Sequence, residues 1–174
     1  MFETSDLLEG RVLRQRLIRA GLLTAALDGL FSSMLTAVFY GSTIARLWKG
    51  VAAVPFGPAA LDAGWVGIGA GLALHVAVAF SWSTLFMMLV LRRARLRQVL
   101  GSTSGKALAA AFYGPLVWVV MSLAVIPLFT HRFPPLNVRW WIQFVGHIPF
   151  VGLPIAASFA NPGRRNGELV KGKP

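Results

Sequence analysis

The stretch GLLTAALDGLFSSMLTAVFYGSTIA, residues 21–45, decides the fold that we predict for this chain. Two sets of residues recur along it at every fourth position, and on a helix such residues lie on nearly the same face. The first set is small: Gly21, Ala25, Gly29, Ser33, Ala37, Gly41 and Ala45. The second set is polar: Thr24, Asp28, Ser32, Thr36 and Tyr40. Most other positions are large and apolar, so we expect a membrane helix with one side suited to close packing and polar contacts.

The composition of the whole chain agrees with a membrane protein. Of its 174 residues, 56% are hydrophobic and only 13% are charged, and the mean hydropathy is +0.65. The absence of cysteine excludes disulfides, thiolate metal sites and thiol catalysis. A net charge of +11 would favour nucleic acid as the partner of a soluble protein. Here the basic residues flank apolar stretches, so we expect the lipid bilayer as partner and no nucleic acid.

The apolar stretches are long enough to predict an all-α polytopic membrane protein, a bundle of four transmembrane helices. We place the membrane domain at 21–160, with spans at about 21–46, 65–91, 107–129 and 140–160. A basic segment at 1–20 precedes the domain, and a basic tail at 161–174 follows it. The stretch from Lys49 to Ala63 contains Pro55, Gly57 and Pro58, which predict a loop between the first two spans.

The distribution of Lys and Arg predicts the orientation in the membrane. The N-terminal segment, the loop between the second and third spans, and the tail hold thirteen of these residues together. The two other loops hold four: Arg46, Lys49, Arg132 and Arg139. Because positive residues favour the cytoplasmic side, we expect both termini in the cytoplasm.

Small residues predict how the first two spans pack. The second span carries Gly67, Gly71 and Ala79 at helical spacing. We expect this stripe to face the small stripe of the first span, where Gly29, Ser33 and Gly41 lie, because small residues let membrane helices approach closely. Small faces left over after this contact would suit a homodimer or a larger membrane complex.

Ionisable side chains inside apolar spans define a candidate polar site. Its members are Asp28, His75, His147, Gln143, Ser32 and Thr36. A charged group in a span is costly and is therefore a functional hypothesis by default. With the first span centred near Ser33, helix rise places Asp28 ~7–8 Å toward the cytoplasm from the midplane. The same calculation places the two histidines at equal depth in the membrane, about two helical turns away from Asp28.

Three interpretations of this site remain open, and none of them is enzymatic. In the first, the protein has a structural or accessory role, and each histidine donates to a freed carbonyl or a hydroxyl. In the second, Asp28, His75 and His147 form a path for protons or a small solute. In the third, His75 and His147 are the ligands of a haem b group held between facing helices.

Several short motifs resemble one family. They are Leu74-His75, Tyr113-Gly114, Val117-Trp118, Met121, Pro127-Leu128, His147 and Gly152-Leu153-Pro154-Ile155, together with Asp28 after small residues. This set is similar to the small four-helix bacterial inner-membrane proteins of uncharacterised function related to YagU. The resemblance implies four spans and the bacterial inner (plasma) membrane as location, and it implies no particular activity.

Overall fold

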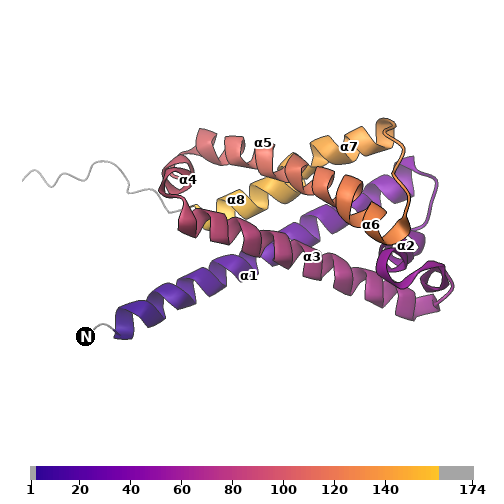
Figure 1. The fold of residues 1–174 in the computed structure, drawn as a ribbon, viewed down its shortest axis with the longest axis horizontal. Coiled ribbons are helices and arrows are strands. Elements are labelled where there is room, and N and C mark those ends of the chain that lie inside the picture. Colours follow the sequence, from indigo (N-terminus) through magenta and orange to yellow (C-terminus); the bar gives the residue numbers. More distant parts are fainter. Residues whose placement is uncertain (1–2, 161–174) are drawn as a thin grey trace, which may run out of the picture.

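The protein is a bundle of helices that are long and apolar enough to cross a membrane (Figure 1). The computed structural model describes the backbone of residues 3–160 and the side chains of 9–160, and the predicted tail at 161–174 lies outside this range. Four membrane-length segments are present in the described part: Glu9–Phe39, Gly64–Arg92, Thr103–Thr130 and Val138–Phe159. A span needs ~20 residues to cross the hydrocarbon core, which each segment exceeds. The prediction of an all-helical bundle with four membrane-crossing segments is confirmed.

Several shorter elements interrupt or connect these segments. In chain order the elements are α1 (Glu3–Met34), the π-helical η1 (Leu35–Phe39), α2 (Ile44–Phe56), the 3-10 helix η2 (Pro58–Leu61), α3 (Gly64–Arg92), α4 (Ala94–Val99), α5 (Thr103–Val120), the π-helical η3 (Met121–Val125), α6 (Ile126–Thr130), α7 (Val138–His147), the π-helical η4 (Ile148–Gly152) and α8 (Leu153–Phe159). Three of the four membrane-length segments therefore contain a π-helical turn, a feature that often marks functional sites.

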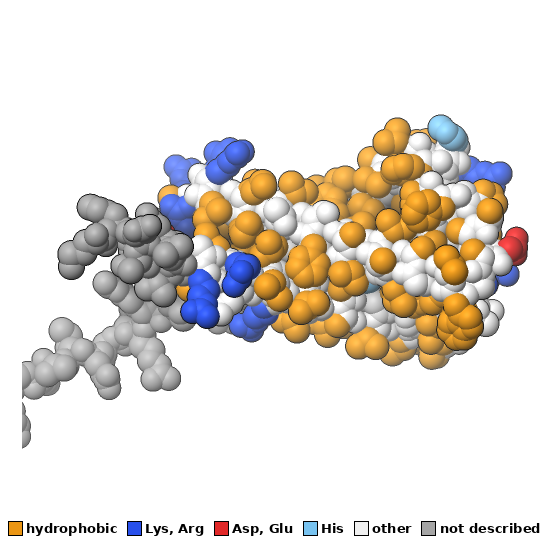
Figure 2. Space-filling view, turned by 90° about the horizontal axis from the view of Figure 1, so that it is seen from below, with side chains coloured by type: hydrophobic (Ala, Val, Ile, Leu, Met, Phe, Trp, Pro, Cys, Tyr) orange, Lys and Arg blue, Asp and Glu red, His pale blue; other side chains and the backbone are white. Residues whose placement is uncertain are grey.

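The two ends of the bundle differ in composition. The start of α1, α4 and the end of α8 lie together at one end, which we call the basic end (Figure 1). Helix α2 and the connection at 131–137 lie at the other, which we call the loop end. Figure 2 shows Lys and Arg side chains gathered at the basic end and hydrophobic side chains covering most of the length between the ends. Exposed apolar residues such as Leu30 and Phe112, 69% and 73% exposed, suit contact with lipid.

The first membrane segment lies earlier in the chain than the predicted span at 21–46. Residues 3–20, predicted to form a separate basic segment, belong to the same unbroken helix α1. The segment ends at Phe39, and Gly41 follows in a left-handed conformation with φ 59° that breaks the helical path. The stripe of small residues continues through Gly41 and Ala45 in the sequence, but the periodicity does not reveal this single-residue break.

Residues predicted as a loop form most of helix α2. The side chain of Thr43 caps its start by accepting a hydrogen bond from the backbone N–H of Arg46. Gly57, with φ 80°, ends the helix, and Pro58 opens η2 immediately afterwards. Pro55 lies inside α2, where it marks a loop in the sequence but forms part of the last helical turn.

Gly67 and Gly71 of α3 pack against η2 and α2, which corrects their predicted contact with the small stripe of α1. A Cβ atom added at Gly71 would collide with the backbone carbonyl of Trp48, and one added at Gly67 would collide with that of Ala60. Gly41 is exposed, with no neighbouring side chain or backbone within 4 Å of an added Cβ, so it is not a packing residue.

Helix α1 does lie against α3, but large side chains of α3 make the contacts. An added Cβ at Gly21 would meet the ring of Phe80, and at Gly29 it would meet Trp48 and His75. Ser33 is only half-buried. The small face of α1 is therefore a surface that accepts aromatic rings rather than a partner for glycines.

A hydrophobic core closes the basic half of the bundle. Phe86, Tyr113, Ile155 and Phe159 are each no more than 6% exposed and bring α3, α5 and α8 together. The Tyr113 hydroxyl donates a hydrogen bond of 2.7 Å to the carbonyl of Trp82.

Helix α5 also approaches the last membrane segment through glycines. The added Cβ of Gly114 would collide with the carbonyl of His147, and that of Gly152 with the carbonyl of Ala110. This close approach sets the position of His147 in the bundle.

The contact between α2 and α3 leads to a first prediction. Gly71→Ala places a methyl group against the Trp48 backbone, so we expect it to lower the free energy of unfolding by about 1–3 kcal/mol, as overpacking does. Gly69→Ala is the matched control, because nothing lies within 4 Å of its added Cβ. Thermal unfolding in detergent compares the two variants. An unchanged melting temperature for Gly71→Ala would show that α2 does not pack closely on α3.

Candidate functional site

The candidate polar residues line one cavity of about 620 Å³ in the half of the bundle nearer the loop end. Helices α1, α2, α3 and α7 and the α5–η3–α6 segment all contribute to its walls. Five of the six residues predicted as the polar site line it: Asp28, Ser32, His75, Gln143 and His147. The cavity lining also includes the exposed residues Arg46 and Phe129, so it reaches the molecular surface near the loop end.

Asp28 and His75 face each other across α1 and α3. The Oδ2 atom of Asp28 lies 4.0 Å from Nδ1 of His75, and the two side chains are only 13% and 17% exposed. The Nε2 atom of His75 lies 3.0 Å from the carbonyl of Ala25. Because a carbonyl only accepts, Nε2 carries a proton, and Nδ1 is the nitrogen left to exchange a proton in the direction of Asp28.

This pairing corrects the predicted separation of Asp28 from the histidines by two helical turns. The first membrane segment ends at Phe39 and not near residue 46, so its middle lies farther from the loop end than Ser33, and Asp28 lies nearer to that middle than predicted. His75 lies ~4–5 Å from the centre of Gly64–Arg92, toward the loop end. The error came from the boundary of the first span and not from the rise per residue.

His147 occupies the opposite wall of the cavity. It is 6% exposed, and its Nδ1 donates a 2.7 Å hydrogen bond to the carbonyl of Gln143 one turn earlier. Its ring centre lies 4.9 Å from that of Trp118. In the neutral ring this arrangement leaves Nε2 as a hydrogen-bond acceptor.

Both histidines thus donate to backbone carbonyls, as the structural interpretation expects. These carbonyls are not ones freed by the prolines of the third and fourth spans, however, since Ala25 lies in α1 and the residue four positions after Gln143 is His147. Pro149 has no N–H to donate to the carbonyl of Val145. That carbonyl instead accepts a hydrogen bond from the N–H of Ile148.

Ser32, Thr36 and Gln143 differ in their relation to the cavity. The amide of Gln143 lies at 3.5 Å from the Ser32 hydroxyl, which links α7 to α1. The hydroxyl of Thr36 donates to the carbonyl of Ser32 within its own helix, at 2.8 Å. Thr36 is buried but does not line the cavity, so the structure does not bring it into the site.

Hydrogen-bonding capacity that the chain does not use is concentrated in this cavity. Five buried side-chain atoms lack a hydrogen-bond partner within the described part of the chain: Thr24 Oγ1, Asp28 Oδ1, Tyr40 Oη, Trp118 Nε1 and Gln143 Oε1. All of these residues except Tyr40 line the cavity. Each buried polar group without a partner costs ~1–3 kcal/mol, so four such groups around one cavity are expected to meet a ligand or water.

Aromatic side chains line the same cavity and were not predicted as site residues. Trp48 comes from α2, Trp82 from α3 and Trp118 from α5. The rings of Trp48 and His75 are 5.2 Å apart in an edge-on arrangement. Trp48 was missed because it falls between the first predicted span and the predicted loop, whereas Thr24 already appeared in the polar set of the first span.

The geometry does not suit the haem hypothesis. Ligation of one iron by both histidines requires a nitrogen of each ring to face a shared position. In His75, Nε2 is bonded to Ala25 and Nδ1 faces Asp28, so both nitrogens are directed at α1. Among the residues that the structure describes, no three His, Asp or Glu side chains are grouped closely enough to hold a metal ion.

Comparison with known protein families, curated proteins and solved structures finds no match to this chain. The resemblance to the proteins related to YagU therefore stays a prediction.

Two hydroxyl groups allow a test of whether the partnerless polar atoms of the cavity stabilise the fold. Thr24→Val removes a hydroxyl without a partner, so we expect stability to change by less than about 0.5 kcal/mol or to rise. Ser122→Ala removes the acceptor of a 3.1 Å bond from Trp140 Nε1, which is buried, and we expect a loss of about 1–3 kcal/mol. Thermal unfolding of both variants provides the comparison. An equal loss for Thr24→Val would mean that its hydroxyl contributes to folding.

Proposed function

We propose that this chain is a membrane transport protein that binds a small organic cation in the cavity and exchanges it for a proton at Asp28 and His75. The observation that carries the proposal is the partnerless Oδ1 atom of Asp28, buried in a cavity whose walls include three tryptophan rings. The cation would contact this atom, which has no hydrogen-bond partner in the described part of the chain.

The lining of the cavity favours a cation over an anion or a neutral solute. Asp28 is the one acidic residue among those that line it. Trp48, Trp82 and Trp118 also line it, and tryptophan is the best aromatic partner for a cation. Arg46 also lines the cavity, but it is exposed and belongs to the part that reaches the surface.

The spacing of Asp28 and His75 supports the exchange of a proton. At 4.0 Å the two atoms are close enough to interact but too far apart for a direct hydrogen bond. Protonation of either group reduces the negative charge available to a cation. A proton and a cation therefore compete for the same site, which is the elementary requirement of an exchanger.

The π-helical turns support a conformational change around the site. The segments η3 and η4 each adjoin the cavity wall, through Val125 and Val151, and each is close to a proline. Interrupted helices beside a binding site are a common feature of secondary transporters. We propose that these segments move when access to the cavity changes from one side of the membrane to the other.

The orientation and location form part of the proposal. The excess of Lys and Arg in the N-terminal segment, the α3–α5 connection and the tail supports both termini in the cytoplasm of a bacterial cell, with the bundle in the inner membrane. The resemblance to proteins related to YagU supports the same location. Four helices are few for a transport path, so we propose a homodimer as the working unit.

A structural or accessory role is the alternative, and Asp28→Asn separates the two. For a transporter, the variant loses cation binding but keeps its fold, because asparagine has nearly the same shape. We expect phenyltrimethylammonium to raise the melting temperature of the wild-type protein and to have an at least about tenfold weaker effect on Asp28→Asn. Asp62→Asn is the matched control, since Asp62 is exposed and does not line the cavity.

The pH dependence tests the exchange. If one proton leaves for each cation bound, the apparent Kd falls by about tenfold per pH unit as the pH rises toward the titration midpoint of the free pair. Isothermal titration calorimetry in buffers of different ionisation enthalpy measures the released proton. Binding without proton release would contradict exchange, and equal binding to wild type and Asp28→Asn would contradict the site.

Flux measurements complete the test. In proteoliposomes with an acidic lumen, the wild-type protein should accumulate phenyltrimethylammonium while protons leave, and Asp28→Asn should not. If Asp28→Asn matches the wild type in melting temperature, and neither protein transports or binds any small organic cation, the structural role is correct.

A further inference from the structure

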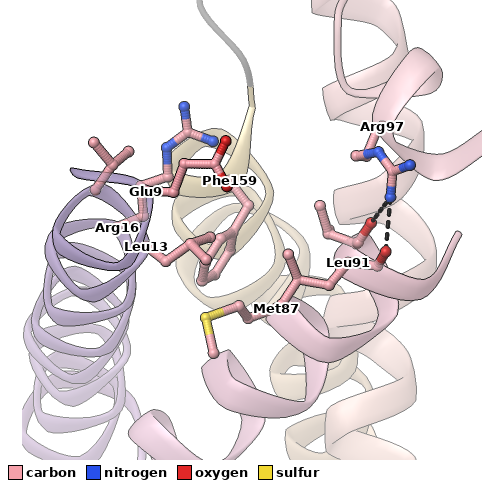
Figure 3. Close-up of a pocket in the computed structure, with 9 residues that line it drawn as sticks. Glu9, Leu13, Arg16, Met87, Leu91, Arg97 and Phe159 are labelled. Carbon is pink, nitrogen blue, oxygen red and sulfur yellow. Dashed lines mark hydrogen bonds between the residues drawn. The ribbon is translucent and has the colours of Figure 1, made fainter. Parts of the chain in front are cut away.

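A second cleft, of about 430 Å³, lies at the basic end, away from the cavity described above. Figure 3 shows its walls: α1 contributes Glu9, Leu13 and Arg16, α3 contributes Met87 and Leu91, and Arg97 and Phe159 come from α4 and α8. None of these residues lines the cavity around Asp28. The cleft thus requires an explanation of its own.

The cleft lies where the apolar surface meets the basic end. On α1 it extends from Glu9 to Arg16, just before the apolar stretch that follows Arg19. On α3 it covers the last turns before the helix ends at Arg92. Further cations surround this level, namely Arg11, Arg14, Arg92, Arg93 and Arg95. In a bilayer this is the depth at which phosphate groups of lipids meet acyl chains.

The inner wall of the cleft is apolar. Leu13 is half-buried, Met87 is half-buried and Phe159 is 2% exposed. Figure 3 shows the side chains of Leu13, Met87 and Phe159 directed into the space between α1 and α3. A free phosphate or nucleotide would make no apolar contact with this surface, whereas a hydrocarbon chain would pack against it favourably.

Two arginines flank the apolar wall, and one of them is oriented by the chain itself. Nη1 of Arg97 donates to the carbonyls of Val90 and Leu91, at 2.9 and 2.8 Å, near the end of α3. These bonds hold the guanidinium group in place and leave the donors on Nε and Nη2 for a ligand. Arg16 lines the cleft from α1, and Glu9 is the one acid among the lining residues. The cleft therefore carries a net positive charge.

We propose that this cleft binds one anionic phospholipid from the surrounding bilayer. Its phosphate lies between Arg16 and Arg97, because guanidinium groups match phosphate oxygens in geometry and charge. One acyl chain packs against Leu13 and Met87, which are only half-buried. A zwitterionic lipid would bring its own cation into a region already rich in arginine, so anionic head groups are favoured.

Native mass spectrometry of the purified, delipidated full-length protein tests this site. We expect one molecule of dioleoylphosphatidylglycerol to bind before any other, and dioleoylphosphatidylcholine to bind at least about tenfold more weakly. The double variant Arg16→Gln/Arg97→Gln should lose this preference. The double variant Arg14→Gln/Arg95→Gln removes the same charge from the same two helices outside the cleft, and should keep it.

A second variant covers the case in which Arg97→Gln disturbs the end of α3. Met87→Trp fills the cleft and leaves every arginine in place, so it too should prevent tight binding of the first phosphatidylglycerol. Three results would overturn the proposal: equal binding of the two lipids, equal loss in both double variants, or full binding by Met87→Trp. Equal loss in both pairs would identify a diffuse attraction to the basic end instead of a site. Cation binding at Asp28 is measured separately, so either proposal is free to fail alone.

Discussion

The contact between Gly71 and the backbone of Trp48 is the constraint on which the site depends. Without a side chain at position 71, α2 lies directly on α3, and the indole of Trp48 reaches Gly29 and His75. His75 in turn contacts the carbonyl of Ala25 on α1. One close backbone approach therefore brings three helices together around the Asp28 carboxylate. Because lipid supplies little hydrophobic driving force between helices, such close packing is the main source of their association.

Most polar residues of the site could be predicted from the sequence, but its tryptophans and the arrangement of the site could not. Periodicity places Thr24, Asp28 and Ser32 on one face of a helix, and these residues do line the cavity. Depth depends on where a span ends, and the left-handed residue Gly41 ends the first membrane segment earlier than composition suggested. A stripe of small residues likewise predicts that another element packs closely on the helix, but it does not identify that element. Gly67 and Gly71 approach α2 and η2, elements that lie in a segment rich in Gly and Pro.

The energetics of Asp28 weigh against a purely structural function for the cavity. An aspartate at the centre of a membrane helix costs ~2.5–3.5 kcal/mol to insert. A residue retained for folding would offset this with hydrogen bonds, as Ser122 does with Trp140. Asp28 Oδ1 has no such bond in the described structure, and neither do Thr24 Oγ1 and Gln143 Oε1. Buried groups without such bonds support the proposal that a ligand binds in the cavity.

Helix α1 contributes residues both to the cleft at the basic end and to the cavity around Asp28. It is unbroken from Glu3 to Met34, and its Arg16 and Asp28 are twelve residues apart, or ~18 Å along the axis. A continuous helix moves nearly as a rigid rod over such a length, because shifting one end without the other would break its hydrogen bonds. A phospholipid that holds Arg16 against Arg97 would therefore also restrain the position of the Asp28 carboxylate relative to His75. In the proposed arrangement the lipid at the basic end would set the register of the helix, and the register would set the Asp28–His75 distance on which the proposed proton exchange depends.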